Sequence, residues 1–302
     1  MSTIGRNESP QTGAEPLTLA RPISAREVLD SVGEWLVLSE PRHQFLLGAL
    51  QRLASAKNRS EGGQERYFAT LRRSGRPCGA VVKTAASLVV SRLPQSGLEA
   101  LAADIDREFR ELPVIFGPEA SAWRLGEALA ARRGGEPSWR LRSTLYLLGD
   151  LKPPHPPVPG LLRRLSLEDA PRAEAWLEAF RLEAMPASLK TAPIARRLIE
   201  GGDLYFWSIY GDDVAIGGVA GRSPRGVRIG WMYTPPEMRK KGYASALISR
   251  LSRRLLEEGA GFCCLYADLS NPASNRLYRR LGYREIESAA EVIVGPPGAD
   301  AR

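Results

Sequence analysis

The most concentrated chemistry in the sequence is the segment RKKGYA at residues 239–244, which holds three cations, a glycine and a small residue where a helix is expected to begin. It follows an apolar run, VRIGWMY at 227–233, and a Thr-Pro-Pro stop. A strand that enters a helix through a glycine-containing turn collects unpaired backbone N–H groups at the positive end of the helix dipole. Because the dipole disfavours lysines at that end, the cations indicate that an anion such as phosphate binds among them. The alternative is an ordinary exposed helix N-terminus.

The positive charge of the chain is concentrated around this segment. Nine cations and a single acid, Glu237, lie between Arg222 and Arg254, so this stretch carries as much net charge as the whole chain, +8. Such a stretch attracts a polyanion, either a phosphate-bearing small molecule or a nucleic acid. A solvated basic helix face is the alternative for Arg250, Arg253 and Arg254.

Several classes of function are excluded by what the sequence lacks. Two histidines and three cysteines (Cys78, Cys263, Cys264) give neither a histidine-based triad nor a metal site nor a disulfide framework. There is no phosphate-loop or dinucleotide-binding fingerprint. No apolar run is long enough for a membrane span or a signal peptide, so we expect a cytoplasmic protein that does not associate with membranes.

The elements that must position the RKKGYA turn lie in the second half of the chain. Residues 150–160 contain five prolines and predict a linker, and residues 1–22 predict a flexible leader. After the linker the patterns predict an alternation of helices and strands. In order, they are a helix over 161–184, a hairpin over 203–221, a strand over 227–233, a helix from 244 to about 259, a strand over 262–269, a helix over 271–281 and a closing strand over 283–294.

The first half repeats this order more loosely. The predicted elements are a hairpin over 65–83, a strand over 87–94, a helix over 96–112, a strand over 113–117 and a helix over 118–130. The last two can be superposed on 262–269 and 271–282, which aligns Ala120-Ser121 with Ala273-Ser274. We therefore predict two tandem domains, at 23–149 and 161–302. Where the second half has RKKGYA, the first has only Pro-Gln-Ser-Gly.

The second half resembles the acetyl-CoA-binding core of the GNAT superfamily of N-acetyltransferases. The resemblance rests on about 50 contiguous residues, from the turn at 239–244 to the downstream signature of Asn271, Tyr278, Gly282 and Tyr283, and extends in element order over 161–302. It implies an α+β fold with a mixed, mostly antiparallel sheet flanked by helices, in two tandem GNAT-like domains. The first domain would be degenerate, since superposition puts Leu125 at Tyr278 and Pro118 at Asn271.

The resemblance also implies roles for individual residues. Backbone amides from residues 239 to 245 would hold the pyrophosphate of coenzyme A, and the strand before them would pair with the pantetheine arm. That strand must diverge from its neighbour at 265–268 to leave its polar groups free. Asn271 would bind the cofactor arm, although a helix cap is an equally good role. Tyr278 would protonate the leaving thiolate, unless its ring only fills the core. The implied cofactor-binding residues are Met232, Tyr233, Thr234, Arg239, Lys240, Lys241, Gly242, Tyr243, Ala244, Ser245 and Asn271.

A general base is not assigned by the sequence. The strand at 227–233 has no carboxylate, and Glu178, Glu183 and Asp203 are candidates beside an already neutral amine. The amine acceptor would lie between the first helix and the hairpin, with Trp207 and Tyr210 as candidate lining residues or as core. Neither Cys263 nor Cys264 is expected to be a nucleophile, because a thiolate is disfavoured inside an apolar strand.

Together these patterns predict an acetyl-CoA-dependent N-acetyltransferase that transfers acetyl directly to a small-molecule or peptide amine without a metal. The acceptor's identity and the oligomeric state are not predicted. Two other classes are kept as alternatives: a non-catalytic acyl-CoA-binding or regulatory module, and an RNA- or ribosome-associated basic protein. Nucleic acid is not expected as the partner. The complete RKKGYA turn argues against the aminoacyl-tRNA-dependent Fem-type transferases, which usually lack it.

Overall fold

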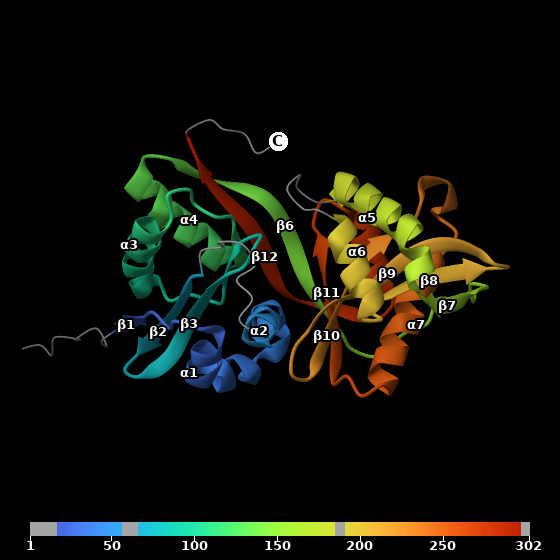
Figure 1. The fold of residues 1–302 in the computed structure, drawn as a ribbon, viewed down its shortest axis with the longest axis horizontal. Helices are drawn as coiled ribbons and strands as arrows, with labels where there is room; N and C mark the ends of the chain where they lie inside the picture. The colour runs from blue at the N-terminus through green and yellow to red at the C-terminus, as the bar shows by residue number, and fades with distance from the viewer. Residues whose placement is uncertain (1–16, 56–65, 185–190, 297–302) are drawn as a thin grey trace, which may run out of the picture.

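The computed structural model describes residues 17–55, 66–184 and 191–296. In these residues the strands form one twelve-stranded, mostly antiparallel sheet flanked by helices, so the predicted α+β fold class is confirmed (Figure 1). Across the sheet the order is β1-β2-β3-β4-β5-β12-β6-β11-β10-β9-β8-β7. The strands are β1 (Leu17–Ala20), β2 (Phe68–Arg73), β3 (Arg76–Lys83), β4 (Leu88–Val90), β5 (Ile115–Pro118), β6 (Glu136–Leu148), β7 (Leu161–Arg164), β8 (Leu204–Ile209), β9 (Asp212–Arg222), β10 (Gly226–Tyr233), β11 (Phe262–Asp268) and β12 (Tyr283–Gly295).

The strand order repeats the same pattern from both edges of the sheet. Strands β1 to β5 run inward from one edge as β7 to β11 run inward from the other. Each set is antiparallel except for its innermost pair, β4 with β5 and β10 with β11, which are parallel. The looser repeat predicted for the first half is therefore present in the fold.

The two halves exchange their last strands at the centre of the sheet. β6, which ends the first half, pairs with β11 of the second half, whereas β12, which ends the second half, pairs with β5 of the first. β6 and β12 pair antiparallel with each other from Tyr283↔Leu148 to Gly295↔Glu136, and they run side by side through the middle of the molecule (Figure 1). The division into domains at 23–149 and 161–302 stays a prediction about chain order, because the sheet is continuous across it.

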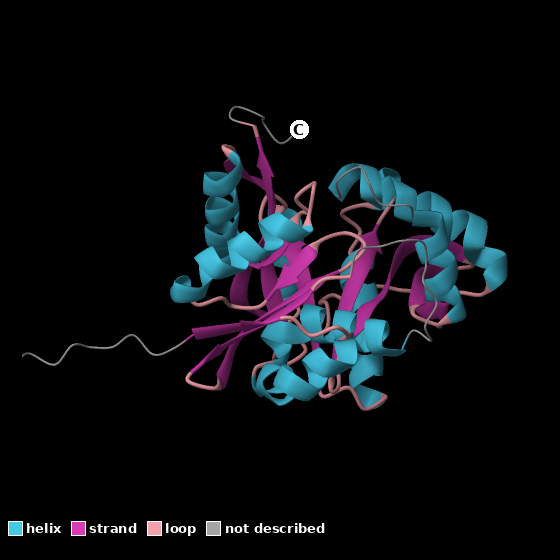
Figure 2. Cartoon of the chain, turned by 60° about the vertical axis from the view of Figure 1, so that its left-hand side comes forward, coloured by secondary structure: helices cyan, strands magenta, loops and turns pink. Residues whose placement is uncertain are grey.

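Helices cover both faces of each half (Figure 2). In the first half, α1 and α2 pack on one face, and α3 and α4 belong to a separate core cluster. In the second half, α5 and α6 share a core with β8 and β9, while α7 and α8 enclose two further clusters. The helices are α1 (Ala25–Leu38), α2 (Glu40–Ser55), α3 (Leu98–Glu108), α4 (Glu119–Arg133), α5 (Ala170–Ala184), α6 (Thr191–Glu200), α7 (Tyr243–Glu257) and α8 (Pro272–Arg280). Among the described helices, none has the length and apolar composition needed to cross a bilayer.

Two sequence expectations need correction. Residues 17–20 of the predicted flexible leader form β1, because they find an antiparallel partner in β2; residues 1–16 lie outside the described residues. Residues 161–164, predicted as helix, form β7 at the edge of the sheet against β8. The helix that follows begins after a capping box of Ser166 and Asp169. The predicted linker at 150–160 contains neither helix nor strand.

Helix α2 joins the first half to the hairpin of β9 and β10. The buried carboxylate of Glu40 accepts hydrogen bonds from Ser223 Oγ (2.7 Å) and from the amides of Arg225 (2.7 Å) and Gly226 (3.1 Å). Gly48 allows the close approach of the helix, since a Cβ there would lie 2.6 Å from the Arg222 carbonyl oxygen. These contacts fix β10, and with it the turn at 239–244, against the first half of the chain.

Candidate functional site

The parallel strands β10 and β11 separate partway along their length. Their pairing begins at Gly226↔Phe262 and ends at Ile229↔Leu265. Beyond Leu265, β11 continues to pair on its other side with β6 as far as Asp268. The edge of β10 that faces this gap therefore keeps free N–H and C=O groups, which is the divergence that the sequence predicted.

A β-bulge sets the direction of β10 at the gap. The register with β9 shifts between Gly230 and Tyr233, and Trp231 between them takes a φ of 60°. A bulge of this kind adds local twist and redirects the strand. Trp231 is held by an edge-on contact with Phe180 of α5, with ring centroids 6.4 Å apart. The gap is thus built into the strand before any ligand is present.

The first turn of α7 presents free amides at the end of this gap. Its N-cap is Gly242, in the left-handed conformation with a φ of 85° and no side-chain cap. The first backbone bond into the helix is donated by Ala246 to the Gly242 carbonyl. Within the described part of the chain, the amides of Gly242, Tyr243, Ala244 and Ser245 donate no hydrogen bond. Four free amides at the positive end of a fifteen-residue helix have the arrangement expected of the anion site that the sequence predicts.

The cations of the turn point in different directions. Arg239 is turned back from the turn, since it donates to both carboxylate oxygens of Glu183 (2.7 Å each) and to the Thr234 carbonyl (2.9 Å). Lys240 is exposed and lines the cavity described below, whereas Lys241 is exposed but does not line it. Two further cations that sequence reasoning missed, Arg276 and Arg280 of α8, also line this cavity.

One open cavity of about 870 Å³ connects these features. It begins at the start of α7, follows the gap beside β10 and continues past β11 to β6, β12, β5 and α2. Every predicted cofactor-binding residue except Lys241 lines it, and so does Tyr278. The cavity therefore brings the predicted phosphate, pantetheine and acid residues of the second half together with side chains of the first half.

Tyr278 reaches the cavity from α8 with a free hydroxyl. Its ring packs between Tyr146 and Tyr283, with centroids 5.9 Å and 6.1 Å away. Its hydroxyl has no hydrogen-bond partner among the described residues. Burial raises the pKa of Tyr278 to about 12, with a smaller contribution from Tyr146, so the group stays protonated at neutral pH and can donate. Tyr278 therefore both packs its ring in the core and lines the cavity, so the two roles considered for it are compatible.

Asn271 has the helix-cap role that the sequence left open. Its Oδ1 accepts a hydrogen bond from the Ser274 amide (3.0 Å) at the start of α8. It is exposed and lines the cavity, so its side-chain amide nitrogen remains available for a ligand. Capping holds the side chain in one orientation at the mouth of the gap.

The carboxylates proposed as general base are all engaged in ion pairs. Asp203 pairs with Arg222 (2.6 Å), and Glu183 holds Arg239 as described. Glu178 accepts from Arg181 and Thr191, and these bonds lower its pKa to about 2. Of the three, only Glu183 lines the cavity, and its two oxygens are occupied. None is placed in the described structure as a free base.

The two aromatic residues suggested for the acceptor groove lie elsewhere. Trp207 is buried in the core beside α7 and donates to the Pro159 carbonyl (3.0 Å), while Tyr210 is 98% exposed at the β8–β9 turn. Cys263 and Cys264 are buried, and burial raises both thiol pKa values to about 12. A thiolate nucleophile is therefore disfavoured at either position, as the apolar strand indicated.

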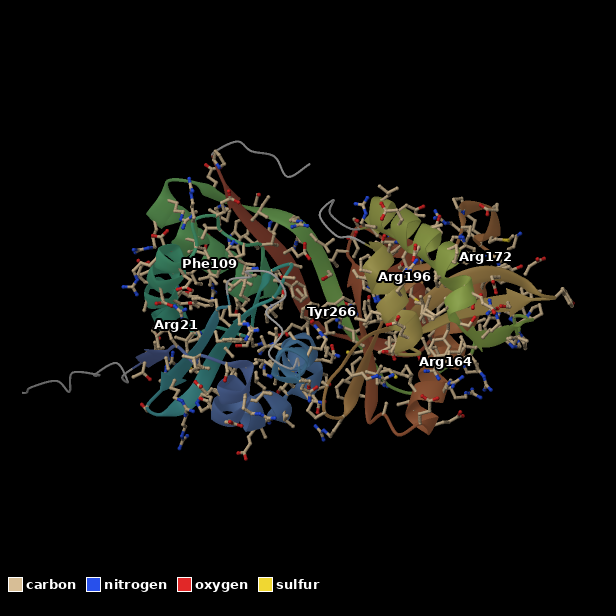
Figure 3. All side chains as sticks on the ribbon, in the orientation of Figure 1. Arg21, Phe109, Arg164, Arg172, Arg196 and Tyr266 are labelled. Carbon is tan, nitrogen blue, oxygen red and sulfur yellow. The ribbon has the colours of Figure 1, made fainter. Side chains whose placement is uncertain are left out.

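The wall of the cavity beside β11 is shared between the two halves of the chain. It consists of the aromatic residues Phe45, Phe116 and Tyr266, with ring centroids between 4.7 and 6.4 Å apart, and Tyr266 lies where the halves meet (Figure 3). Arg228 stacks over Phe45 at 4.5 Å and donates to Gln44 (3.0 Å). Sequence reasoning missed this wall, because its residues come from three separate segments, α2, β5 and β11.

Glu291 of β12 is a further cavity residue that the sequence did not reveal. It lines the cavity, and the only signal in the sequence is one acid inside the apolar run AAEVIV. Its Oε2 is buried without a hydrogen bond, although Arg140 Nε lies 3.5 Å away, a long and poorly aligned contact. Burial raises the pKa of Glu291, and Arg140 offsets part of this effect.

In the first half, the region that corresponds to the gap is closed. The Leu93 amide, which follows β4, donates to Ser121 Oγ (2.9 Å), so it is already used within the chain. A Cβ on Gly117 of β5 would lie 2.5 Å from the Val90 carbonyl oxygen, so the two strands stay close. Leu125, which superposes on Tyr278, is fully buried in the apolar core.

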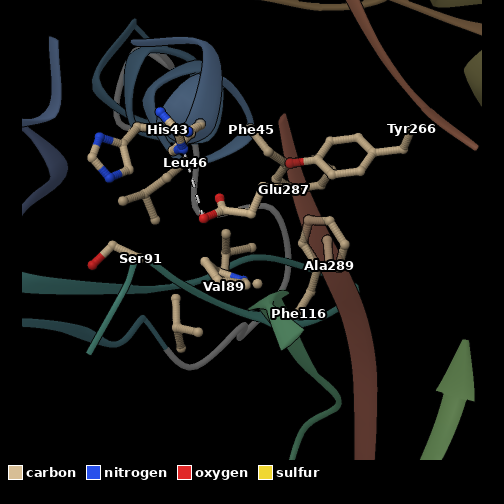
Figure 4. A pocket seen from close by; sticks show the side chains of 13 residues that line it. His43, Phe45, Leu46, Val89, Ser91, Phe116, Tyr266, Glu287 and Ala289 are labelled. Atoms are coloured by element: carbon tan, nitrogen blue, oxygen red, sulfur yellow. Dashed lines mark ion pairs between the residues drawn. The ribbon is translucent and has the colours of Figure 1, made fainter. Parts of the chain in front are cut away.

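Only a small space remains near this closed region (Figure 4). It measures about 10 Å³ and lies between α2, β4, β5 and β12. The carboxylate of Glu287 extends into it and pairs with Arg92 (2.6 Å) and Arg42 (3.8 Å). A space of this size holds about one water molecule, so it is not a second cofactor site.

Comparisons with known proteins agree with this geometry. The Acetyltransferase (GNAT) family model matches residues 169–283. A comparison with curated proteins found no match. Among solved structures, a Drosophila protein is similar over 92% of this chain and 98% of its own, with a TM-score of 0.63 at 18% identity. A GCN5-related N-acetyltransferase from Sphaerobacter thermophilus is similar over 94% and 97%, with a TM-score of 0.55 at 17% identity.

A tandem GNAT protein from the clavulanic acid biosynthesis pathway is also similar. It covers 93% of this chain and 98% of its own, with a TM-score of 0.54 at 14% identity. At such identities the likeness concerns the fold alone. Residues 169–283 thus match the Acetyltransferase (GNAT) family, and the chain has a fold similar to that of a tandem GNAT protein.

Proposed function

We propose that the protein is an acetyl-CoA-dependent N-acetyltransferase that acts on a small-molecule or peptide amine in the cytoplasm. One observation carries this proposal. The gap beside β10, the free amides of α7 and the unpartnered hydroxyl of Tyr278 all open onto one cavity. A site for anion binding alone would need only the α7 amides, whereas acetyl transfer needs all three.

In this proposal, the chain's own groups hold coenzyme A along the gap. The amides of Gly242 to Ser245 bind the pyrophosphate, with Lys240 beside it, and the free edge of β10 at Met232, Tyr233 and Thr234 pairs with the pantetheine arm. Arg276 and Arg280 add positive charge at the same end. The Asn271 side chain, fixed by its cap, donates to the arm.

Tyr278 then acts on the leaving group. Transfer of acetyl from sulfur to nitrogen breaks a C–S bond and leaves a thiolate, which the Tyr278 hydroxyl stabilises by donating a hydrogen bond. The proton that the amine loses ends on the thiol. Because both cysteines of β11 are held protonated by burial, the acetyl group passes directly from thioester to amine.

The amine is delivered neutral, without a dedicated carboxylate base. Arg228 lies on β10 one residue before the last paired position, Ile229, and lines the cavity. A fixed positive charge lowers the pKa of a nearby ammonium group, which favours the nucleophilic form. Arg228 pairs with no acid in the described residues, so its charge is not neutralised.

A non-catalytic acyl-CoA module is the main alternative. Thiol release from acetyl-CoA with a panel of amines separates the two functions. The proposal predicts amine-dependent release by the wild-type chain, whereas a binding module takes up acetyl-CoA and releases no thiol with any amine.

An RNA-associated role is less well supported by the structure. Four cations of the basic segment, Arg222, Arg225, Arg239 and Arg254, form ion pairs with acids, so the segment is not an open polycationic face. RNA binding by the wild-type chain that falls steeply with salt, together with no binding of acetyl-CoA, would favour this alternative.

A further inference from the structure

The acceptor end of the cavity contains one carboxylate, Glu291, whose buried oxygen accepts no hydrogen bond and forms only a long ion pair, to Arg140 Nε at 3.5 Å. Three acids line the cavity: Glu183 holds Arg239, Asp268 accepts from the Ser270 amide (2.8 Å), and Glu291 accepts no hydrogen bond from any described residue. A carboxylate oxygen that is buried without a hydrogen bond is costly, so it is expected where a ligand supplies the missing donor. Among these acids, Glu291 is the one with such an oxygen, on a side chain that is 23% exposed toward the cavity, and it is therefore the candidate for binding a cation of the acceptor.

The strand registers place Glu291 far from the acetyl group. Leu265, where the gap opens, faces Tyr146 of β6, and Glu291 faces Leu141 of β6. The backbones of Leu265 and Glu291 are thus five residues apart along the strands and two strands apart across the sheet. At ~3.4 Å per residue and ~4.8 Å per strand, this separation is roughly 20 Å. A group that takes a proton from the attacking amine must lie within about 3 Å of it, so Glu291 cannot be that base.

The cavity between these two points suits a flexible, cationic chain. Phe116, the cross-strand neighbour of Glu291, belongs to the aromatic wall with Phe45 and Tyr266. Aromatic faces contact methylene groups and attract ammonium groups through cation–π interactions. Arg228 pairs through Cys264 with Leu147 of β6, six residues along that strand from Leu141, which faces Glu291. Its charge therefore disfavours an ammonium group near the thioester and not one at Glu291.

We infer that Glu291 binds a second, distal ammonium group of the acceptor, so that the acceptor is an elongated amine with at least two cationic groups, of the polyamine kind. This inference rests on the proposed acetyl transfer. It also gives the strand exchange a functional consequence. β12 carries Glu291 out of the second half and places it against β5, so the acceptor site requires both halves.

The test compares spermidine, which has several ammonium groups, with butylamine, which has one. Wild-type protein, Glu291→Gln and a charge-matched control, Glu200→Gln, are assayed with acetyl-CoA; Glu200 is exposed on α6 and does not line the cavity. We expect wild type and Glu200→Gln to prefer spermidine. In Glu291→Gln the kcat/KM for spermidine relative to butylamine should fall roughly 10- to 100-fold, mainly through KM, because a hydrogen bond to a charged group is lost.

Two further measurements keep the outcomes distinct. Acetyl-CoA affinity should be the same in all three proteins, and Glu291→Asp should retain part of the preference. If the wild type acetylates both amines equally, or if Glu291→Gln keeps the preference, the inference is wrong while the proposed function stands. If neither amine is acetylated, calorimetric titration of spermidine into the full chain decides: weaker binding by Glu291→Gln supports the inference, and equal or absent binding contradicts it.

Discussion

Replacement of Tyr278 by phenylalanine tests the chemistry of the site without disturbing its structure. The Tyr278 hydroxyl has no hydrogen-bond partner in the described residues, and the ring keeps its contacts with Tyr146 and Tyr283 in the variant. The free energy of unfolding should therefore change by less than about 0.5 kcal/mol. Acetyl-CoA affinity should be unchanged, since the hydroxyl is proposed to act on the leaving group.

The size of the effect follows from the pKa of Tyr278. With the tyrosine at about 12 and a thiol near ~8.5, full proton transfer to the thiolate is uphill by ~3.5 pKa units, or about 5 kcal/mol. The hydroxyl is therefore a hydrogen-bond donor more than a proton source. A hydrogen bond to a charged group contributes about 1.5–3 kcal/mol, so kcat should fall roughly 10- to 150-fold.

The assay is steady-state thiol release at saturating amine, paired with calorimetric titration of acetyl-CoA and a thermal melt. A Tyr278→Phe variant with wild-type kcat would refute the assigned role and favour the non-catalytic module. A variant that loses both stability and cofactor affinity would show that the main role of Tyr278 is structural, in the packing of the core.

Two other changes test the frame around the site. Glu40→Gln should lower the free energy of unfolding by about 1.5–3 kcal/mol in urea at pH 7, because the glutamine NH2 group cannot accept the hydrogen bond that Arg225 Nε donates to Oε2 and the ion pair with Arg225 is lost. Burial alone would raise the pKa of Glu40, but the hydrogen bonds to its carboxylate more than offset burial, so the pKa in the folded protein is lowered. The stabilisation that the carboxylate provides is therefore lost as pH falls through the folded pKa, and the difference in unfolding free energy between wild type and Glu40→Gln should shrink in acid. A difference that stays constant with pH would contradict this assignment. Cys263→Ala and Cys264→Ala should each retain kcat within a factor of two in the same thiol-release assay, whereas loss of turnover in a folded variant would indicate a covalent intermediate.

The part of the site that could be predicted from the sequence is local in the chain. The end of β10, the turn at 239–244 and the start of α7 are contiguous, so residue type and spacing were enough to predict a candidate anion site there. The same holds for α8, a nine-residue helix that carries Tyr278 and is capped by the residue before it, Asn271. Hydrophobic periodicity also gave most elements of the repeat.

The remainder depends on pairings between distant segments. The alternating pattern of β6 or β12 is compatible with a place in either half, so the exchange of last strands could not be inferred from it. Glu291 and the aromatic wall meet only through this exchange. Trp207 illustrates another limit of the sequence. It was a candidate for the acceptor groove but lies in the core beside α7, because strand periodicity does not say which face of the sheet α7 covers.

Calorimetric titration of acetyl-CoA into wild-type protein, Gly242→Val and Lys240→Ala tests the central claim most directly. Wild type should bind. Gly242→Val should abolish detectable binding, because valine disfavours the left-handed φ of 85° and its Cβ would approach Val158 Cγ2 to 2.8 Å where the amides must meet the pyrophosphate. Lys240→Ala should weaken binding by about fivefold, as expected for one exposed charge. No binding by wild type, or equal and small effects of the two substitutions, would contradict the proposed cofactor site.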